Sequence, residues 1–295
     1  MKSKFSKIFP VLKNAFKSWF AKDPLRESGI IAYYAIFSLP GLLMVILTLA
    51  GYFFGREAVN NQVAAQFSST MGADTANQIQ DIIVQASRMR NSLLATILAV
   101  ITILVGATGV FVEFQNALNQ VWQVKVDVSK STIWHIIRIR LFSFGLIISI
   151  AFLLVVSLLI STLIAAFGNW LSSHFTDSIL ILIQFMNTGF SFVVLAVLFA
   201  LMYKILPDAK IEWKHVWIGS FVTAFLFGIG KYALGLYFSQ LSPGIGYGAA
   251  GSIILIMLWV TYSSAIVLFG AEFTFAYATM FAGKVAPSEI AKKTT

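Results

Sequence analysis

The chain has 295 residues, of which 58% are hydrophobic and 11% charged, whereas soluble domains carry about 25% charged residues. It contains no cysteine, which excludes disulfide bonds and every metal site or nucleophile that depends on a thiolate. Its net charge of +9 is compatible with a nucleic-acid or a membrane surface, and the positions of the basic residues decide between these.

Long uncharged runs predict six transmembrane helices. Between Glu27 and Arg56, for example, no Asp, Glu, Lys or Arg occurs, and a bilayer core requires only about 20 apolar residues per helix. The expected spans are residues 29–54, 92–112, 141–166, 178–202, 216–240 and 250–280. The fifth span contains one charged residue, Lys231. The expected fold class is therefore all-α, with residues 1–295 forming a single polytopic membrane domain.

Two segments outside the spans have an amphipathic pattern. Apolar residues recur at helical spacing in residues 1–28 with lysines between them, which predicts a cytoplasmic interfacial helix beginning at Pro10. Residues 56–91 show two such patterns, one on each side of Gly72. They are expected to form extracytoplasmic helices over the outer face of the bundle, while residues 281–295 are expected to be a cytoplasmic tail.

The distribution of basic residues predicts the topology. Residues 1–27, 113–140, 203–215 and 281–295 together carry 17 of the 21 Lys and Arg residues, and 56–91 carries three. This imbalance follows the positive-inside rule if both termini are cytoplasmic and the chain spans its membrane several times. The basic character is thus explained by membrane topology, and nucleic acid is not an expected partner.

Motifs of enzymes are matched only out of context. Residues 246–251 fit the phosphate-binding pattern GxGxxG, but they join two predicted spans with no strand before them. His135, His174 and His215 lie in three separate connections without a carboxylate-rich cluster. The sequence therefore predicts neither an enzyme nor a metal or other cofactor.

Polar residues are expected to gather where the helices reach the cytoplasm. The candidate substrate-binding residues at this mouth are Arg26, Glu113, Asn116, Asn119, Asp208 and Glu272. Ionisable groups in membrane helices are functional candidates, although residues near the interface cost less to bury. Two interpretations remain open: the residues bind a substrate, or they form a salt-bridged cap that fastens the helix ends.

Lys231 is the seventh candidate, and its expected depth is different. It lies about 22 Å above the cytoplasmic start of its helix, and Glu272 lies about 34 Å below the outer start of the next helix. In a core about 30 Å thick the two residues are on opposite sides of the midplane. Lys231 either extends to the outer interface or faces a polar cavity that accepts an anion. Nearby glycines that permit close helix approach, Gly228, Gly230 and Gly235, favour the cavity.

Four segments resemble the YihY/BrkB family of bacterial inner-membrane proteins, once labelled ribonuclease BN. They are Ala32-Tyr33-Tyr34-Ala35-Ile36-Phe37-Ser38-Leu39-Pro40, Ala117-Leu118-Asn119-Gln120-Val121-Trp122, Tyr203-Lys204-Ile205-Leu206-Pro207-Asp208, and residues 247–259 continuing into Gly270-Ala271-Glu272. The resemblance covers nearly the whole chain except its extreme termini. It implies the six-helix fold of that family, whose ribonuclease label is regarded as a misassignment.

The leading hypothesis is a transporter or flippase for an amphiphilic, lipid-linked anionic substrate, with membrane lipids as partners. Polar groups at two depths and the lack of a soluble catalytic domain support this hypothesis. The alternative is a non-transporting membrane scaffold whose polar helix ends hold the bundle together and recruit other proteins.

Overall fold

A computed structural model describes residues 2–38, 80, 109–126, 177–241, 247, 251–283, 286–288 and 291–293. Several predictions fall outside these residues. They are the extracytoplasmic helices in 56–91, the third span at 141–166, and most of the first and second spans at 29–54 and 92–112.

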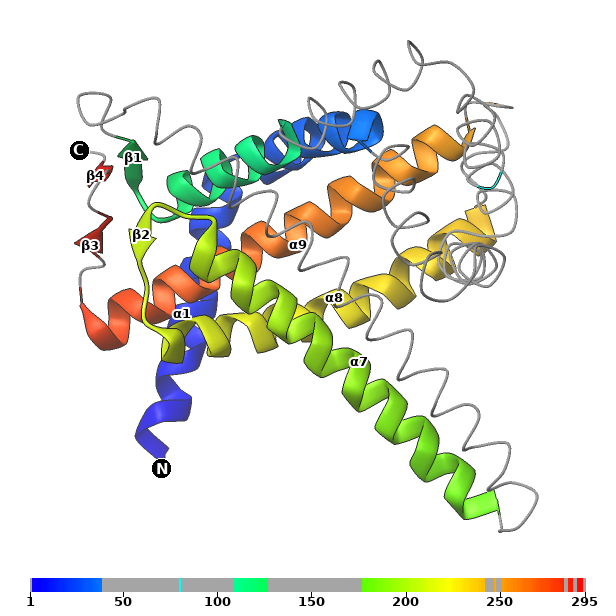
Figure 1. Ribbon diagram of the computed structural model, residues 1–295. Helices are drawn as coiled ribbons and strands as arrows, with labels where there is room; N and C mark the ends of the chain where they lie inside the picture. The colour runs from blue at the N-terminus through cyan, green and yellow to red at the C-terminus, as the bar shows by residue number, and fades with distance from the viewer. Residues whose placement is uncertain are drawn as a thin grey trace, which may run out of the picture.

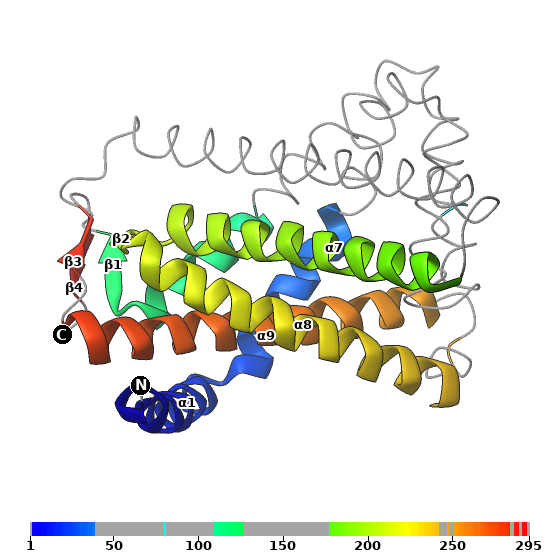
Figure 2. The ribbon, with the colours of Figure 1, turned by 90° about the horizontal axis from the view of Figure 1, so that it is seen from below.

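Three long helices dominate the described part of the chain: α7 (Asp177–Ile205), α8 (Trp213–Leu241) and α9 (Gly251–Ala282). Each is long and apolar enough to cross a membrane, and each coincides within three residues at either end with a predicted span. Figures 1 and 2 show α8 packed between α7 and α9. Helical residues 24–38 and 109–121 occupy the start of the first predicted span and the end of the second. The chain is a helical membrane protein with at least three candidate spans.

Helix α1 (Lys2–Ala21) begins before Pro10, so the predicted start was wrong. The amphipathic repeat in the sequence continues on both sides of the proline, and packing of Val11 and Ala15 after it offsets the missing backbone hydrogen bond. Val11 and Ala15 are fully buried against Phe273 of α9, and the Trp19 indole donates a hydrogen bond to the Ala265 carbonyl at 3.1 Å. The outward face of α1 exposes Phe9, Leu12, Phe16 and Phe20, as expected for a helix that contacts lipid.

Four short strands correct the all-α expectation. β1 (Val124–Val126) pairs antiparallel with β4 (Ala291–Lys293), and β2 (Ala209–Lys210) pairs antiparallel with β3 (Ala286–Pro287). The predicted C-terminal tail therefore pairs with the segment that follows the 109–121 helix and with the segment that joins α7 to α8. These pairings give the backbone N–H and C=O groups of the three segments their hydrogen-bond partners. Figure 1 shows the strands at the end of the bundle where both termini lie.

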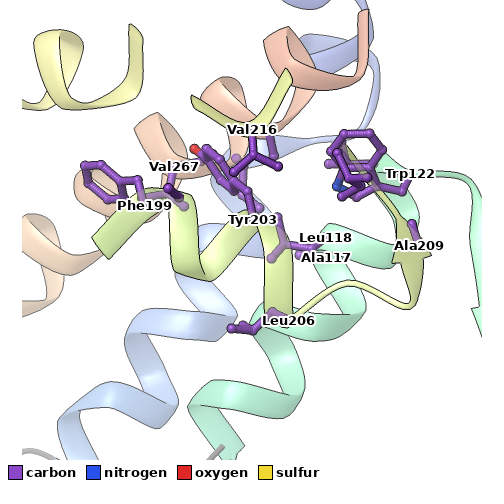
Figure 3. Close-up of a cluster of buried hydrophobic side chains, with 14 of the residues drawn as sticks. Ala117, Leu118, Trp122, Phe199, Tyr203, Leu206, Ala209, Val216 and Val267 are labelled. Carbon is purple, nitrogen blue, oxygen red and sulfur yellow. The ribbon is translucent and has the colours of Figure 1, made fainter. Parts of the chain in front are cut away.

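The main hydrophobic core lies near the same end. Figure 3 shows Tyr203, Leu118, Val216 and Val267 converging from α7, the 109–121 helix, α8 and α9. The Tyr203 hydroxyl donates to the Val267 carbonyl at 2.7 Å and lies 2.8 Å from the Thr223 hydroxyl. The phenol is therefore satisfied although it is fully buried.

Glycines bring α8 and α9 into close contact. A Cβ on Gly219 would lie 1.7 Å from Oγ1 of Thr274, and one on Gly270 would lie 1.8 Å from Oγ1 of Thr223. Farther along, Gly230 meets the Tyr262 ring. These contacts define one antiparallel register along the pair, and small residues permit such close approach of membrane helices.

Candidate functional site

A cleft opens beside the end of α9 at the strand-bearing end of the bundle. Its enclosed volume is about 10 Å³, the space of about one water molecule, and the rest of the cleft is open to solvent. Four elements contribute to its lining: α1 and the turn after it, the 24–38 helix, the 109–121 helix and α9. The lining residues are Trp19, Lys22, Pro24, Glu27, Ala117, Gln120, Val121, Leu268 and Glu272.

A tight turn after α1 places Lys22 in this cleft. Asp23 has a φ of 49°, in the left-handed region that Asp adopts more readily than most residues. The Asp23 carbonyl accepts hydrogen bonds from the amides of Arg26 and Glu27 at 3.1 and 3.2 Å. Pro24 occupies the first turn of the new helix, where its missing N–H costs nothing. The sequence Lys22-Asp23-Pro24 therefore ends one helix and begins the next.

Lys22 and Glu272 form an ion pair in the cleft. Lys22 Nζ lies 2.5 Å from Glu272 Oε1 and 3.5 Å from the Val121 carbonyl oxygen. Glu272 is only 1% exposed, whereas a quarter of the Lys22 side chain is exposed. The second carboxylate oxygen, Glu272 Oε2, is buried and has no hydrogen-bond partner among the described residues.

Asp208 belongs to a separate polar cluster. Its Oδ2 atom accepts hydrogen bonds from Asn119 Nδ2 at 2.9 Å and from Gln115 Nε2 at 3.1 Å. The Asp208 amide donates to Asn119 Oδ1 at 2.8 Å, and its carbonyl accepts from the Ser288 amide at 2.9 Å. Asp208 thereby ties the 109–121 helix, the connection after α7 and the C-terminal strands together.

The predicted mouth is thus divided between two places. Of its residues only Glu272 lines the cleft, while Asn119 and Asp208 belong to the second cluster. Glu113 is half-buried and absent from the cleft lining, and Arg26 and Asn116 are exposed.

Lys22, which sequence reasoning missed, is 250 residues away from its partner. The available signals were the tryptophan three residues before it and the Asp-Pro pair after it. These predict a helix end, and neither indicates what the lysine contacts.

Lys231 lies away from the cleft, as the sequence predicted. Lys231 follows Gly230, which contacts Tyr262 of α9. Tyr262 lies ten residues before Glu272 in α9, so Lys231 is about 15 Å from Glu272 along the helix axis. Lys231 is half-buried. Of the three glycines expected to allow close approach near it, Gly230 makes such a contact, whereas a Cβ on Gly228 or Gly235 would meet nothing within 4 Å.

Comparison with known proteins decides the family. The sequence model of the family described as "Virulence factor BrkB" matches residues 15–294. The chain belongs to the BrkB family. The match extends to residue 294 and includes β3 and β4, while residues 1–14 lie outside it.

BrkB-family relatives cover most of the chain. It is 24% identical over 264 residues to a UPF0761 membrane protein of Pseudoalteromonas atlantica, covering 86% of this chain and 81% of the relative. A UPF0761 membrane protein of Alteromonas mediterranea is 23% identical over 299 residues, covering 97% and 95%. No solved structure matches the chain. These relatives support a multi-pass membrane protein of the BrkB family.

Proposed function

We propose that this BrkB-family protein is a transporter or flippase for an amphiphilic, lipid-linked substrate with an anionic headgroup. The observation that carries the proposal is the cleft at the end of α9, in which the buried Lys22–Glu272 pair is accessible through the partly exposed lysine. An anionic headgroup at the opening of the cleft can become a further partner of Lys22, whose side chain is partly exposed there. Lys231, about 15 Å farther along the bundle, offers a second cationic position.

In this proposal the protein has six transmembrane helices and both termini in the cytoplasm of a bacterial cell, whose inner membrane it spans. Residues 29–54, 92–112 and 141–166 supply the three other spans. The protein catalyses no covalent reaction, needs no cofactor and binds no nucleic acid. Its partners are membrane lipids and the amphiphile, and alternating access moves the headgroup between the cleft and Lys231.

Single cysteines in the cysteine-free chain test the orientation. We expect Ser69→Cys to react with an impermeant thiol reagent in spheroplasts, and Glu212→Cys to react only after permeabilisation, because basic connections remain in the cytoplasm. Glu212 is suitable because 63% of its side chain is exposed, whereas the Ser288 hydroxyl is buried. Labelling of position 212 but not 69 in spheroplasts would reverse the proposed topology.

Substitutions of Lys231 test whether the protein transports lipid. A lysine costs roughly 2.5–3.5 kcal/mol at the centre of a membrane helix and less toward its ends, so Lys231→Met is expected to melt at or above the wild-type temperature. If Lys231 binds the headgroup, the same variant loses transbilayer movement of a fluorescent anionic phospholipid in proteoliposomes. Lys231→Arg is expected to retain part of it, because the charge is kept and the geometry changes.

Lys214→Met is the matched control, since Lys214 is an exposed lysine at the start of the same helix. It should transport as wild type does. Full transport by Lys231→Met would show that Lys231 only extends to the interface. A wild-type rate no higher than that of protein-free vesicles would favour the scaffold alternative.

A further inference from the structure

One oxygen of the Glu272 carboxylate accepts no hydrogen bond from the described residues. Oε1 accepts from Lys22 Nζ at 2.5 Å, while Oε2 is buried without a partner among the described residues. A carboxylate oxygen removed from water costs free energy unless it accepts a hydrogen bond. Because Glu272 lines the cleft, a ligand with an N–H or O–H donor can supply that bond.

The charges around the cleft favour a cationic donor. Its described lining contains two carboxylates, Glu27 and Glu272, but only one cation, Lys22, so it has a formal net charge of −1. Lys22 nevertheless has donor capacity left. An ammonium carries three N–H groups, and among the described residues Nζ donates to Glu272 Oε1 and to the more distant Val121 carbonyl oxygen. A positive group that enters the cleft and a negative group at its opening can therefore be bound together.

An apolar surface continues from the cleft onto the outside of α1. Trp19 lines the cleft, and its ring centroid lies 5.7 Å from that of Phe16. Phe16 is 55% exposed and Phe20 is 70% exposed, and their rings stack with centroids 6.4 Å apart. An aromatic helix face of this kind lies at the boundary between headgroups and acyl chains. This location favours a lipid over a water-soluble ligand.

We propose that the mouth of the cleft binds the zwitterionic headgroup of an aminophospholipid, with only its primary ammonium entering to donate to Glu272 Oε2 and its phosphate facing Lys22 from outside. The inference rests on the proposed function: the phosphate is the anionic group of the headgroup, and the ammonium is a second, positive group that the cleft recognises. Glu27 adds a second carboxylate near the ammonium. A headgroup bearing three methyl groups on nitrogen has the same charges but no N–H donor, so the site distinguishes it from the primary amine.

Thermal melting of the purified full-length protein in detergent tests the chemistry. Dioleoyl phosphatidylethanolamine is expected to raise the melting temperature with at least about tenfold higher apparent affinity than dioleoyl phosphatidylcholine or phosphatidylglycerol, which corresponds to one hydrogen bond to a charged group. Equal stabilisation by the three lipids would overturn the inference. Equal stabilisation by free phosphoethanolamine would overturn the assignment to a lipid.

Variants of cleft residues test whether phosphatidylethanolamine binds at the cleft. Glu272→Gln and Glu27→Gln are each expected to reduce the preference for phosphatidylethanolamine, and the control Glu212→Gln, on an exposed connection, should keep it. The preference is measured within each variant, so a lower starting stability of Glu272→Gln does not obscure it. A preference unchanged in both cleft variants would place the lipid elsewhere. Transport of phosphatidylglycerol without any preference would leave the proposed function intact, whereas absence of all lipid transport would remove its basis.

Discussion

Replacing Gly270 with alanine is expected to destabilise the protein by about 3 kcal/mol, the upper part of the range for overpacking a core. The added Cβ would lie 1.8 Å from Oγ1 of Thr223, 2.9 Å from its Cβ and 2.4 Å from the Tyr203 hydroxyl. Thr223 and Tyr203 are both fully buried, so neither side chain can move into solvent. Separation of α7 and α8 from α9 would also break the hydrogen bond from the Tyr203 hydroxyl of α7 to the Val267 carbonyl of α9. The melting temperature of the purified variant in detergent measures this loss.

Two glycines of α8 provide matched controls. A Cβ on Gly228 or Gly235 would meet nothing within 4 Å, and alanine is favoured over glycine in a helix by up to about 1 kcal/mol. Gly228→Ala and Gly235→Ala should therefore melt at or slightly above the wild-type temperature. If Gly270→Ala melted at the same temperature as these two variants, the close contact of Gly270 with Thr223 of α8 would be wrong.

The sequence predicted the long helices because long apolar runs without charged residues define them. The end of α7 and the start of α8 fall where Lys204, Asp208 and Lys214 interrupt the apolar runs, because a charge in lipid is costly. The start of α1 was mispredicted at Pro10 because proline is favoured in the first turn of a helix and disfavoured in its interior. That local rule could not include the packing of Val11 and Ala15 against α9.

The cleft and the strands could not be predicted in the same way. The pairing of Val124 with Lys293 involves strands of two or three residues, too short to show an alternating pattern. The close approach at Gly270 depends on the register of α8 and α9, which composition does not contain. Glu272 was identified as a buried ionisable residue, but its partner Lys22 was counted only as one of many basic residues at the cytoplasmic side.

Loss of the Lys22 charge should have the second large effect. Lys22→Met leaves the Glu272 carboxylate buried without its cation, and breaking a buried pair in this way costs about 3–5 kcal/mol. Because a quarter of the Lys22 side chain is exposed, we expect about 2–3 kcal/mol, the lower value reflecting solvent screening. Lys17→Met is the control, since Lys17 is an exposed lysine on α1. It should leave the melting temperature unchanged.

The double variant Lys22→Met/Glu272→Met separates charge from packing. Replacing both members of a buried ion pair with apolar residues of similar size is often neutral or stabilising, so the double variant should recover most of the stability that Lys22→Met loses. It should also lose the preference for phosphatidylethanolamine, because both charged groups that would face the headgroup are gone. A double variant as unstable as Lys22→Met would mean that Lys22 acts by packing α1 against α9. A stable double variant without lipid preference would mean that the bundle does not need this ion pair to fold, and that the pair is retained for binding.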